Sequence, residues 1–149
     1  MPSREQPPLL GTAHFRVLIG RRELGFSEVG PLTSGTAPED AYDGREPGFA
    51  PIVLRRALTQ STELYDWRRN VAAGKADRRT VTIHQLDAAG GAIVNSWRLE
   101  GAWPRRWSGP SFDARGNDVA MEEIELCFAD LVWLEPNTEK QGGRSVRAT

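Results

Sequence analysis

The chain has 149 residues, of which 39% are hydrophobic, and this is the size of one ordinary domain with one buried core. Its 19 Lys and Arg residues against 20 Asp and Glu residues give a formal charge of -1, which excludes recognition of nucleic acid or an anionic membrane through overall charge. Cys127 is the single cysteine, so the sequence also excludes an intramolecular disulfide and a thiolate metal cluster.

The first segment, residues 1–13, is rich in proline and polar residues, and we expect it to form a flexible or extended arm. It contains no apolar stretch long enough for a signal peptide, and no window of the chain reaches membrane-spanning length. We therefore expect a protein made in the bacterial cytoplasm. The folded domain is expected over residues 14–134, followed by a polar tail over residues 135–149.

Short apolar runs separated by glycine and proline dominate the first third of the domain. His14–Ile19 predicts a first strand, and a tight turn leads to its antiparallel return over Glu23–Val29. A long excursion follows, and its flanks, Leu32–Thr36 and Phe49–Arg56, are expected to pair as a second, projecting hairpin.

One helix is predicted, over Ser61–Gly74. Either Ser61 or Thr62 can cap its first turn, and Gly74 supplies the stop. Its apolar residues fall on one face, which predicts that the helix lies against a sheet. The stripe consists of Leu64, Trp67 and Val71.

Alternating strands are predicted over Arg79–Leu86 and Ala92–Leu99, joined by a glycine-containing hairpin loop. A bend at Trp103-Pro104 then leads to a last alternating segment, Asn117–Trp133, which is long enough to require a bulge or bend within it. The chain therefore predicts a mainly β domain. We expect an antiparallel β-barrel or sandwich, closed or nearly closed, with one flanking α-helix.

Candidate catalytic groups are sparse. His14 and His84 stand far from any second ligand at metal spacing, so we predict no metal and no cofactor. Cys127 shares a strand face with Glu123 and Glu125, whose carboxylates raise a thiol pKa and disfavour a nucleophile. A solvated or channel-lining stripe explains these glutamates better than a hydrolytic pair, and we predict that the protein is not an enzyme.

Arginine occurs in five adjacent pairs, with several tryptophans nearby. Such a composition suits stacking on nucleic acid, but also subunit interfaces, where Arg and Trp are enriched. The near-neutral charge favours the second interpretation. The pairs are Arg21-Arg22, Arg55-Arg56, Arg68-Arg69, Arg78-Arg79 and Arg105-Arg106.

An ordered series of motifs between about Phe15 and Trp133 resembles the tail tube proteins of contractile phages and the inner tube proteins of extracellular contractile injection systems. The motifs are Gly25–Leu32, Leu54–Thr59, Leu64–Trp67 with Gly74-Lys75, Trp97–Pro110 and Glu122–Leu126.

This resemblance implies a β-barrel-like structural subunit that stacks as hexameric rings into a tube. The tube's lumen would carry DNA or an effector protein, and its partners would be sheath, baseplate or spike and tube-terminator proteins. Subunit contacts are expected at Leu32, Phe49, Trp103, Arg105, Arg106 and Trp107. The lumen is expected to be lined by Thr82, Arg98, Glu123 and Glu125.

Two alternatives remain open at this level. The segment Thr36–Phe49 is shorter and more interrupted by Gly and Pro than the hairpin usual in that family, as expected for a special ring that joins the tube to the baseplate spike. In a different class, the chain would be a monomeric adaptor or ligand-binding β module that uses exposed tryptophans.

Overall fold

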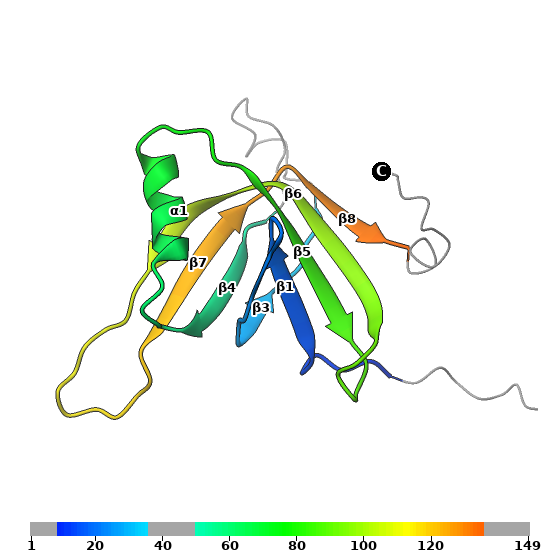
Figure 1. The fold of residues 1–149 in the computed structure, drawn as a ribbon, viewed down its shortest axis with the longest axis horizontal. Coiled ribbons are helices and arrows are strands. Elements are labelled where there is room, and N and C mark those ends of the chain that lie inside the picture. Colours follow the sequence, from blue (N-terminus) through cyan, green and yellow to red (C-terminus); the bar gives the residue numbers. More distant parts are fainter. Residues whose placement is uncertain (1–8, 36–49, 136–149) are drawn as a thin grey trace, which may run out of the picture.

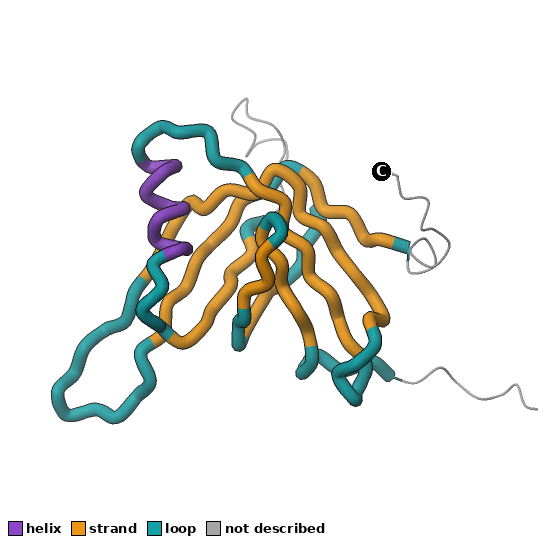
Figure 2. The backbone as a smooth tube through the Cα atoms, in the orientation of Figure 1, coloured by secondary structure: helices purple, strands orange, loops and turns teal. Residues whose placement is uncertain are grey.

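A computed structural model describes residues 9–35 and 50–135. Within them the chain forms a strongly curled antiparallel sheet with one helix at its side (Figures 1 and 2). The elements are β1 (Phe15–Ile19), β2 (Arg22–Leu24), β3 (Glu28–Gly30), β4 (Ile52–Ala57), α1 (Glu63–Ala72), β5 (Arg79–Leu86), β6 (Ile93–Ser108), β7 (Met121–Cys127) and β8 (Asp130–Leu134). The predicted mainly β fold with one helix is therefore confirmed.

The strands follow the order β2-β1-β5-β6-β7-β4-β3, and β8 pairs with β6 beside β7. Strand β6 is long enough to belong to both halves of the sheet, because β5 and β8 pair with its first part and β7 with its second. The two terminal strands of this order, β2 and β3, do not pair with each other. The barrel is thus open along one side.

The core lies inside the curl and is built from alternate residues of the strands, as the period of two requires. Helix α1 adds Leu64 and Trp67, which are 2% and 0% exposed, while Val71 of the predicted stripe is partly buried against them. The strands contribute Val17, Ile19, Leu24, Ile52, Leu54, Val81, Ile83, Leu99, Ala102, Ile124 and Leu126, and Phe128 joins them from the segment between β7 and β8.

The helix begins and ends close to the prediction, but its cap differs. Thr62 occupies the N-cap position, yet its hydroxyl donates to Asp66 Oδ2 at 2.9 Å instead of bonding the first turn. The nearby hydroxyl of Ser61 accepts from the backbone N–H of Glu63 at 3.4 Å. Gly74 stops the helix in the left-handed region at φ 87°.

The predicted return strand Glu23–Val29 is wrong as one element. After β2 the chain leaves β1, and β3 pairs with β4 from Glu28↔Arg55 to Gly30↔Val53. Ser27 makes the switch, because its backbone N–H and its hydroxyl both donate to the carbonyl oxygen of Arg55, at 2.8 and 3.1 Å.

A second antiparallel pair therefore exists, but its first strand is β3, which precedes the expected flank Leu32–Thr36. Leu32 lies beyond the paired residues, and Phe49 and most of the excursion lie outside the described residues. The expected N-terminal arm and C-terminal tail also lie largely outside them.

The predicted bend at Trp103-Pro104 is not a break, since β6 runs through it as one strand. Register shifts lie on both sides of this position instead, one opposite Arg79/Val81 and one between Pro104 and Arg106, and a third lies opposite Gln85/Leu86 near the start of β6. The first shift contains Gly101 in the left-handed region at φ 66°, where glycine has no steric penalty. Pro104 lies beyond the last residue that pairs with β5, at the position in a sheet where a missing N–H is tolerated.

The interruption predicted within Asn117–Trp133 is confirmed, but the predicted start is wrong, since the strand begins at Met121 and residues 117–120 belong to the loop before it. Strands β7 and β8 pair with successive parts of β6 and are separated from each other by Phe128 and Ala129. The N–H of Ala129 donates to the carbonyl of Glu100 at 2.8 Å and keeps the interruption against β6.

Candidate assembly surfaces

The residues predicted to line a lumen lie on the outer face of the sheet, opposite the core. Thr82 and Arg98 are direct cross-strand partners on β5 and β6. Glu123 and Glu125 lie on β7, where alternate residues are buried. The two pairs belong to the two halves of the sheet that β6 joins. A channel wall can contain all four only if it follows the length of β6, so the lumen assignment stays a prediction.

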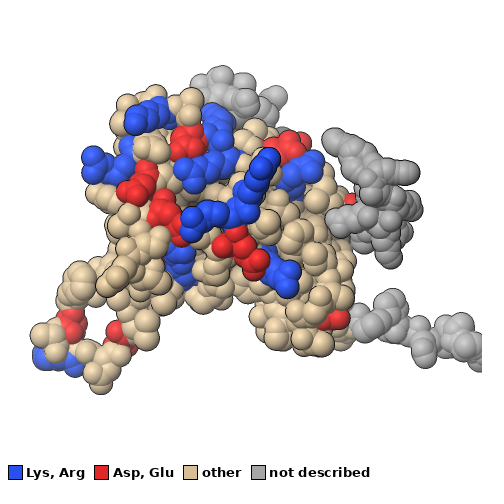
Figure 3. All heavy atoms as spheres, viewed as in Figure 1, with Lys and Arg blue, Asp and Glu red and all other residues tan. Residues whose placement is uncertain are grey.

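Charges on this outer face are paired within the subunit. Arg98 Nε lies 2.6 Å from Glu100 Oε2, Arg105 Nη2 lies 2.8 Å from Glu125 Oε2, and Arg55 Nε lies 3.7 Å from Glu123 Oε1. Figure 3 shows basic and acidic side chains interspersed over the visible face. Local pairing leaves little net field, in agreement with the near-neutral composition.

The predicted contact residues Trp103, Arg105, Arg106 and Trp107 lie on the second part of β6 and not in a loop. Arg105 and Arg106 are exposed, whereas both tryptophans are half-buried. Trp103 lines a hollow of about 340 Å³ beside the end of α1, with the Arg78 guanidinium 6.0 Å from its ring centroid. The two arginines and Trp103 are thus accessible to a neighbour.

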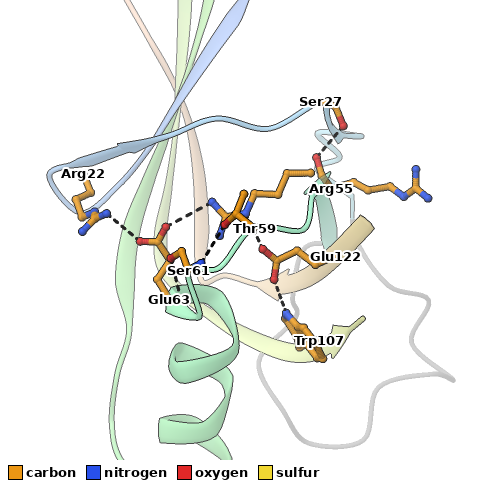
Figure 4. A network of polar contacts seen from close by, with 9 residues as sticks. Arg22, Ser27, Arg55, Thr59, Ser61, Glu63, Trp107 and Glu122 are labelled. Carbon is orange, nitrogen blue, oxygen red and sulfur yellow. Dashed lines mark hydrogen bonds and ion pairs between the residues drawn. The ribbon is translucent and has the colours of Figure 1, made fainter. Parts of the chain in front are cut away.

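Trp107 instead holds the fold together. Its indole Nε1 donates to Glu122 Oε1 at 2.9 Å, and its ring meets Tyr65 of α1 edge-on, with centroids 5.1 Å apart. Glu122 also accepts from Arg56 Nε, and Arg56 and Arg22 both reach Glu63 at the start of α1 (Figure 4). This network fixes the helix to β4, β6 and β7.

Leu32 is half-buried at the open side of the barrel. It lines a hollow of about 370 Å³, called here the mouth, together with Phe15, Val29, Ile83, Trp97 and the polar residues Thr12, His14, Ser27, Glu28 and Gln85. The mouth is a mainly apolar surface depression that adjoins a predicted contact residue.

Strand β8 carries an exposed tryptophan next to an unpaired strand edge. Trp133 is 64% exposed, its ring lies 5.4 Å from that of Trp97, and its Nε1 donates to Asn95 Oδ1 at 3.2 Å. Within the described residues β8 pairs only with β6, so its other edge is free. The motif series ended at this tryptophan, but its exposure was not predicted.

The described residues contain no cluster of three or more His, Cys, Asp or Glu side chains able to hold a metal ion. His84 Nδ1 lies 2.7 Å from the hydroxyl of Ser96, its cross-strand partner. Burial raises the pKa of the Cys127 thiol. Arg105 partly offsets this increase, and Glu125 adds to it. The expected direction is confirmed, although burial and not the carboxylates is the main cause.

Arginine pairs serve the fold as well as the surface. Arg68 Nη1 donates to the carbonyl of Pro104 at 3.1 Å, and the Arg79 guanidinium lies 4.6 Å from the Trp67 ring centroid while it pairs with Asp77. The arginine pairs near tryptophans, which suggested a subunit interface, are therefore explained in part by contacts within the subunit.

Sequence reasoning missed the loop between β6 and β7, residues 109–120, which projects from the body at the lower left of Figure 1. It presents Phe112 at 87% and Val119 at 70% exposure. Two apolar residues within a polar, glycine-containing segment were the available signal, because such residues are normally buried when a loop packs on its own domain.

Comparisons with known proteins agree on one architecture. The family model described as T4-like virus tail tube protein gp19 matches residues 11–132. No curated protein matches the chain in sequence. No helix among the described residues has the length and apolar character needed to cross a membrane.

Two similar solved structures come from PVC, an extracellular contractile injection system in its extended state. A chain of its sheath-tube complex is 24% identical with a TM-score of 0.68, over 85% of this chain and 91% of that one. A chain of its sheath/tube terminator is 25% identical with a TM-score of 0.71, over 87% and 99%. Hcp1 from Flavobacterium johnsoniae, at 13% identity, a TM-score of 0.58 and coverage of 80% and 94%, shares the fold.

Proposed function

Because this chain belongs to the T4-like virus tail tube protein family and is a structural subunit of a tube, we propose that it assembles as stacked hexameric rings. The tube is the rigid inner conduit of a contractile phage tail or phage-like injection particle. Its function is geometric, and the proposal includes no catalytic step.

The observation that carries this proposal is the set of unpaired strand edges. Within the described residues β2, β3 and β8 each pair along one edge only. Exposed edges lead to uncontrolled association unless they are covered or paired. Neighbouring copies around a ring would satisfy them, because a head-to-tail contact that closes leaves no free end.

The channel would be lined by the outer face around Thr82 and Arg98, or around Glu123 and Glu125, or by both. Paired charges on this face suit a wall along which a charged cargo slides without strong attachment, since the field of each pair is short-ranged. Both DNA and an effector protein remain candidate cargoes.

The proposed partners follow from the similar structures, which come from a sheath-tube complex, a tube terminator and a baseplate. We propose that copies of this chain meet each other, a sheath, a terminator and a baseplate or spike protein. We further propose synthesis in the cytoplasm before incorporation into the particle.

The repeating tube subunit is favoured over the special ring on the spike, because the family match is to the tail tube protein itself. No observation favours a monomeric ligand-binding module.

Negative-stain microscopy of the purified protein, with and without a ring of the baseplate as initiator, tests the proposal. We expect rings at high concentration and tubes when an initiator is present. Particles that stay monomeric under both conditions, with sedimentation confirming one species, would contradict it.

A further inference from the structure

The loop of residues 109–120 is ordered, although it lies outside the sheet. The N–H of Gly116 donates to the carbonyl of Asp113 at 2.9 Å, and the N–H of Arg115 donates to Asp113 Oδ1 at 3.0 Å. At its base, the N–H of Leu58 donates to the carbonyl of Ala120 at 2.9 Å. These bonds close a turn directly after Phe112 and attach the base of the loop to the end of β4.

Phe112 does not pack on its own domain. A hollow of about 490 Å³ separates the loop from the sheet, with Arg55 and Glu123 on its far wall. The ring is 87% exposed, so the monomer gains almost nothing from it. Burial of a phenylalanine ring removes a large apolar area from water, which makes this side chain a strong anchor for a partner.

The mouth has the size and chemistry to receive an aromatic ring. Its volume is about 370 Å³ and its apolar wall consists of Phe15, Val29, Leu32, Ile83 and Trp97. An apolar cavity of about 150 Å³ already admits benzene. The mouth lies where the barrel is open, between β3 and the strands β1, β5 and β6, so it is accessible from outside.

Charges beside the two surfaces are complementary. Arg115, on the loop, has a side chain that is 91% exposed, and its contact with Asp113 at 3.5 Å is a solvated surface pair of little strength. Glu28, on the rim of the mouth, is exposed and lies opposite Arg55 of β4, but it forms no ion pair within the described residues. The loop thus offers a cation, Arg115, close to an aromatic ring, and the mouth offers an anion, Glu28, close to an apolar hollow.

The loop and the mouth are separate surfaces of one molecule that adjoin along β3 and β4, because Glu28 on the rim of the mouth is the cross-strand partner of Arg55 on the wall of the loop's hollow. In Figure 1 the loop projects at the lower left, whereas β1 begins and β5 ends at the lower right. Phe112 lines the hollow beside the loop and not the mouth of its own subunit, but a second copy displaced along the long axis can bring its loop to the mouth. Repetition of such a head-to-tail contact generates a ring.

We infer that Phe112 of each subunit inserts into the mouth of a second copy of this chain, with Arg115 paired to Glu28 of that copy. The inference rests on the proposed ring assembly and specifies one contact that forms it. It replaces the half-buried Trp107 as the aromatic anchor between subunits.

Cysteine cross-linking of assembled particles tests the contact directly. On a Cys127→Ser background, one protein carries Phe112→Cys and another carries Leu32→Cys, and the two are mixed and oxidised. We expect disulfide-linked dimers only in the mixture, and a ladder up to the ring size when one chain carries both. A control pair of Ala72→Cys with Leu32→Cys should give no specific product.

Charge exchange provides the second measurement. Arg115→Glu and Glu28→Arg should each raise the concentration needed for ring formation by about tenfold, and the double variant should restore it. Phe112→Ala should raise the concentration needed for ring formation at least as much. Its melting temperature should stay unchanged, because the Phe112 side chain is exposed in the monomer.

The outcomes separate the two proposals. If the wild type forms rings but the Phe112→Cys and Leu32→Cys proteins give no cross-link, this inference is overturned and the proposed function stays intact. The same holds if Phe112→Ala forms rings at the wild-type concentration. A wild-type protein that forms neither rings nor tubes contradicts both. A double charge variant that assembles no better than either single variant overturns the pairing of Arg115 with Glu28.

Discussion

Arg56 of β4 and Glu122 of β7 are direct cross-strand partners, and their side chains form a buried ion pair with Nε 2.7 Å from Oε2. The two side chains are 10% and 1% exposed. Trp107 donates to the second carboxylate oxygen, so this pair connects two strands, the end of β6 and, through Glu63, the helix.

Breaking this pair should destabilise the domain strongly. Glu122→Ala leaves the buried Arg56 guanidinium with only its longer contact to Glu63, at 3.4 Å, and we expect a loss of about 3 kcal/mol in the free energy of unfolding by urea. Glu122→Gln should cost less, because the amide can still accept from Trp107. Glu123→Gln is the matched control, since its pair with Arg55 is exposed and worth about 0–1 kcal/mol. Equal losses for Glu122→Ala and Glu123→Gln would show that the buried pair has no special role.

Gly101 should not tolerate a side chain. Its φ of 66° is strained for other residues, and an added Cβ would lie 3.3 Å from the Cβ of Ala129. We expect Gly101→Ala to lower the free energy of unfolding by about 1–3 kcal/mol. Gly91→Ala serves as control, because nothing lies within 4 Å of its added Cβ and its φ is not positive. A chemical denaturation curve for each variant measures the difference, and a neutral Gly101→Ala would refute the role of this bulge in bending β6.

Asp77 should make stability depend on pH in acid. The hydrogen bond from Arg79 is the main reason why the pKa of Asp77 lies below its ordinary value of 3.8. Burial raises this pKa, and the hydrogen bond from Asn70 lowers it again. A lowered folded-state pKa stabilises the fold above the unfolded pKa, and this contribution is lost as the pH falls through the folded value. Asp77→Asn should therefore be less stable than wild type at about pH 7 and approach it at about pH 2. Thermal melts across this range measure the gap, and a gap independent of pH would be inconsistent with the assignment.

Trp133 tests the free edge of β8 separately from stability. Trp133→Lys places a charge at an exposed edge position, which is how natural sheets prevent edge pairing. We expect the melting temperature to change by no more than a few degrees and ring formation to fail in electron micrographs. Ala72→Lys, on the exposed side of α1, should leave rings intact. Normal rings with Trp133→Lys would mean that neighbours do not pair along β8.

Local pattern determined much of this protein. Apolar alternation identified β1, β5 and β7, the stripe of Leu64 and Trp67 placed α1 against the sheet, and the excess length of Asn117–Trp133 required the interruption found at Phe128. These predictions succeeded because the residues that decide them are neighbours along the chain. The family resemblance rested on the same local motifs.

Tertiary structure alone decided which edges pair and which stay open. Nothing local in Glu23–Val29 indicates that the strand divides, because the carbonyl of Arg55 that attracts Ser27 comes from β4. In the same way, the burial of Trp107 depends on Glu122 and Tyr65, while Phe112 is exposed only because its loop turns away from the sheet. Long-range contacts select among local alternatives of similar free energy, so the assembly surface could be located only in the folded chain.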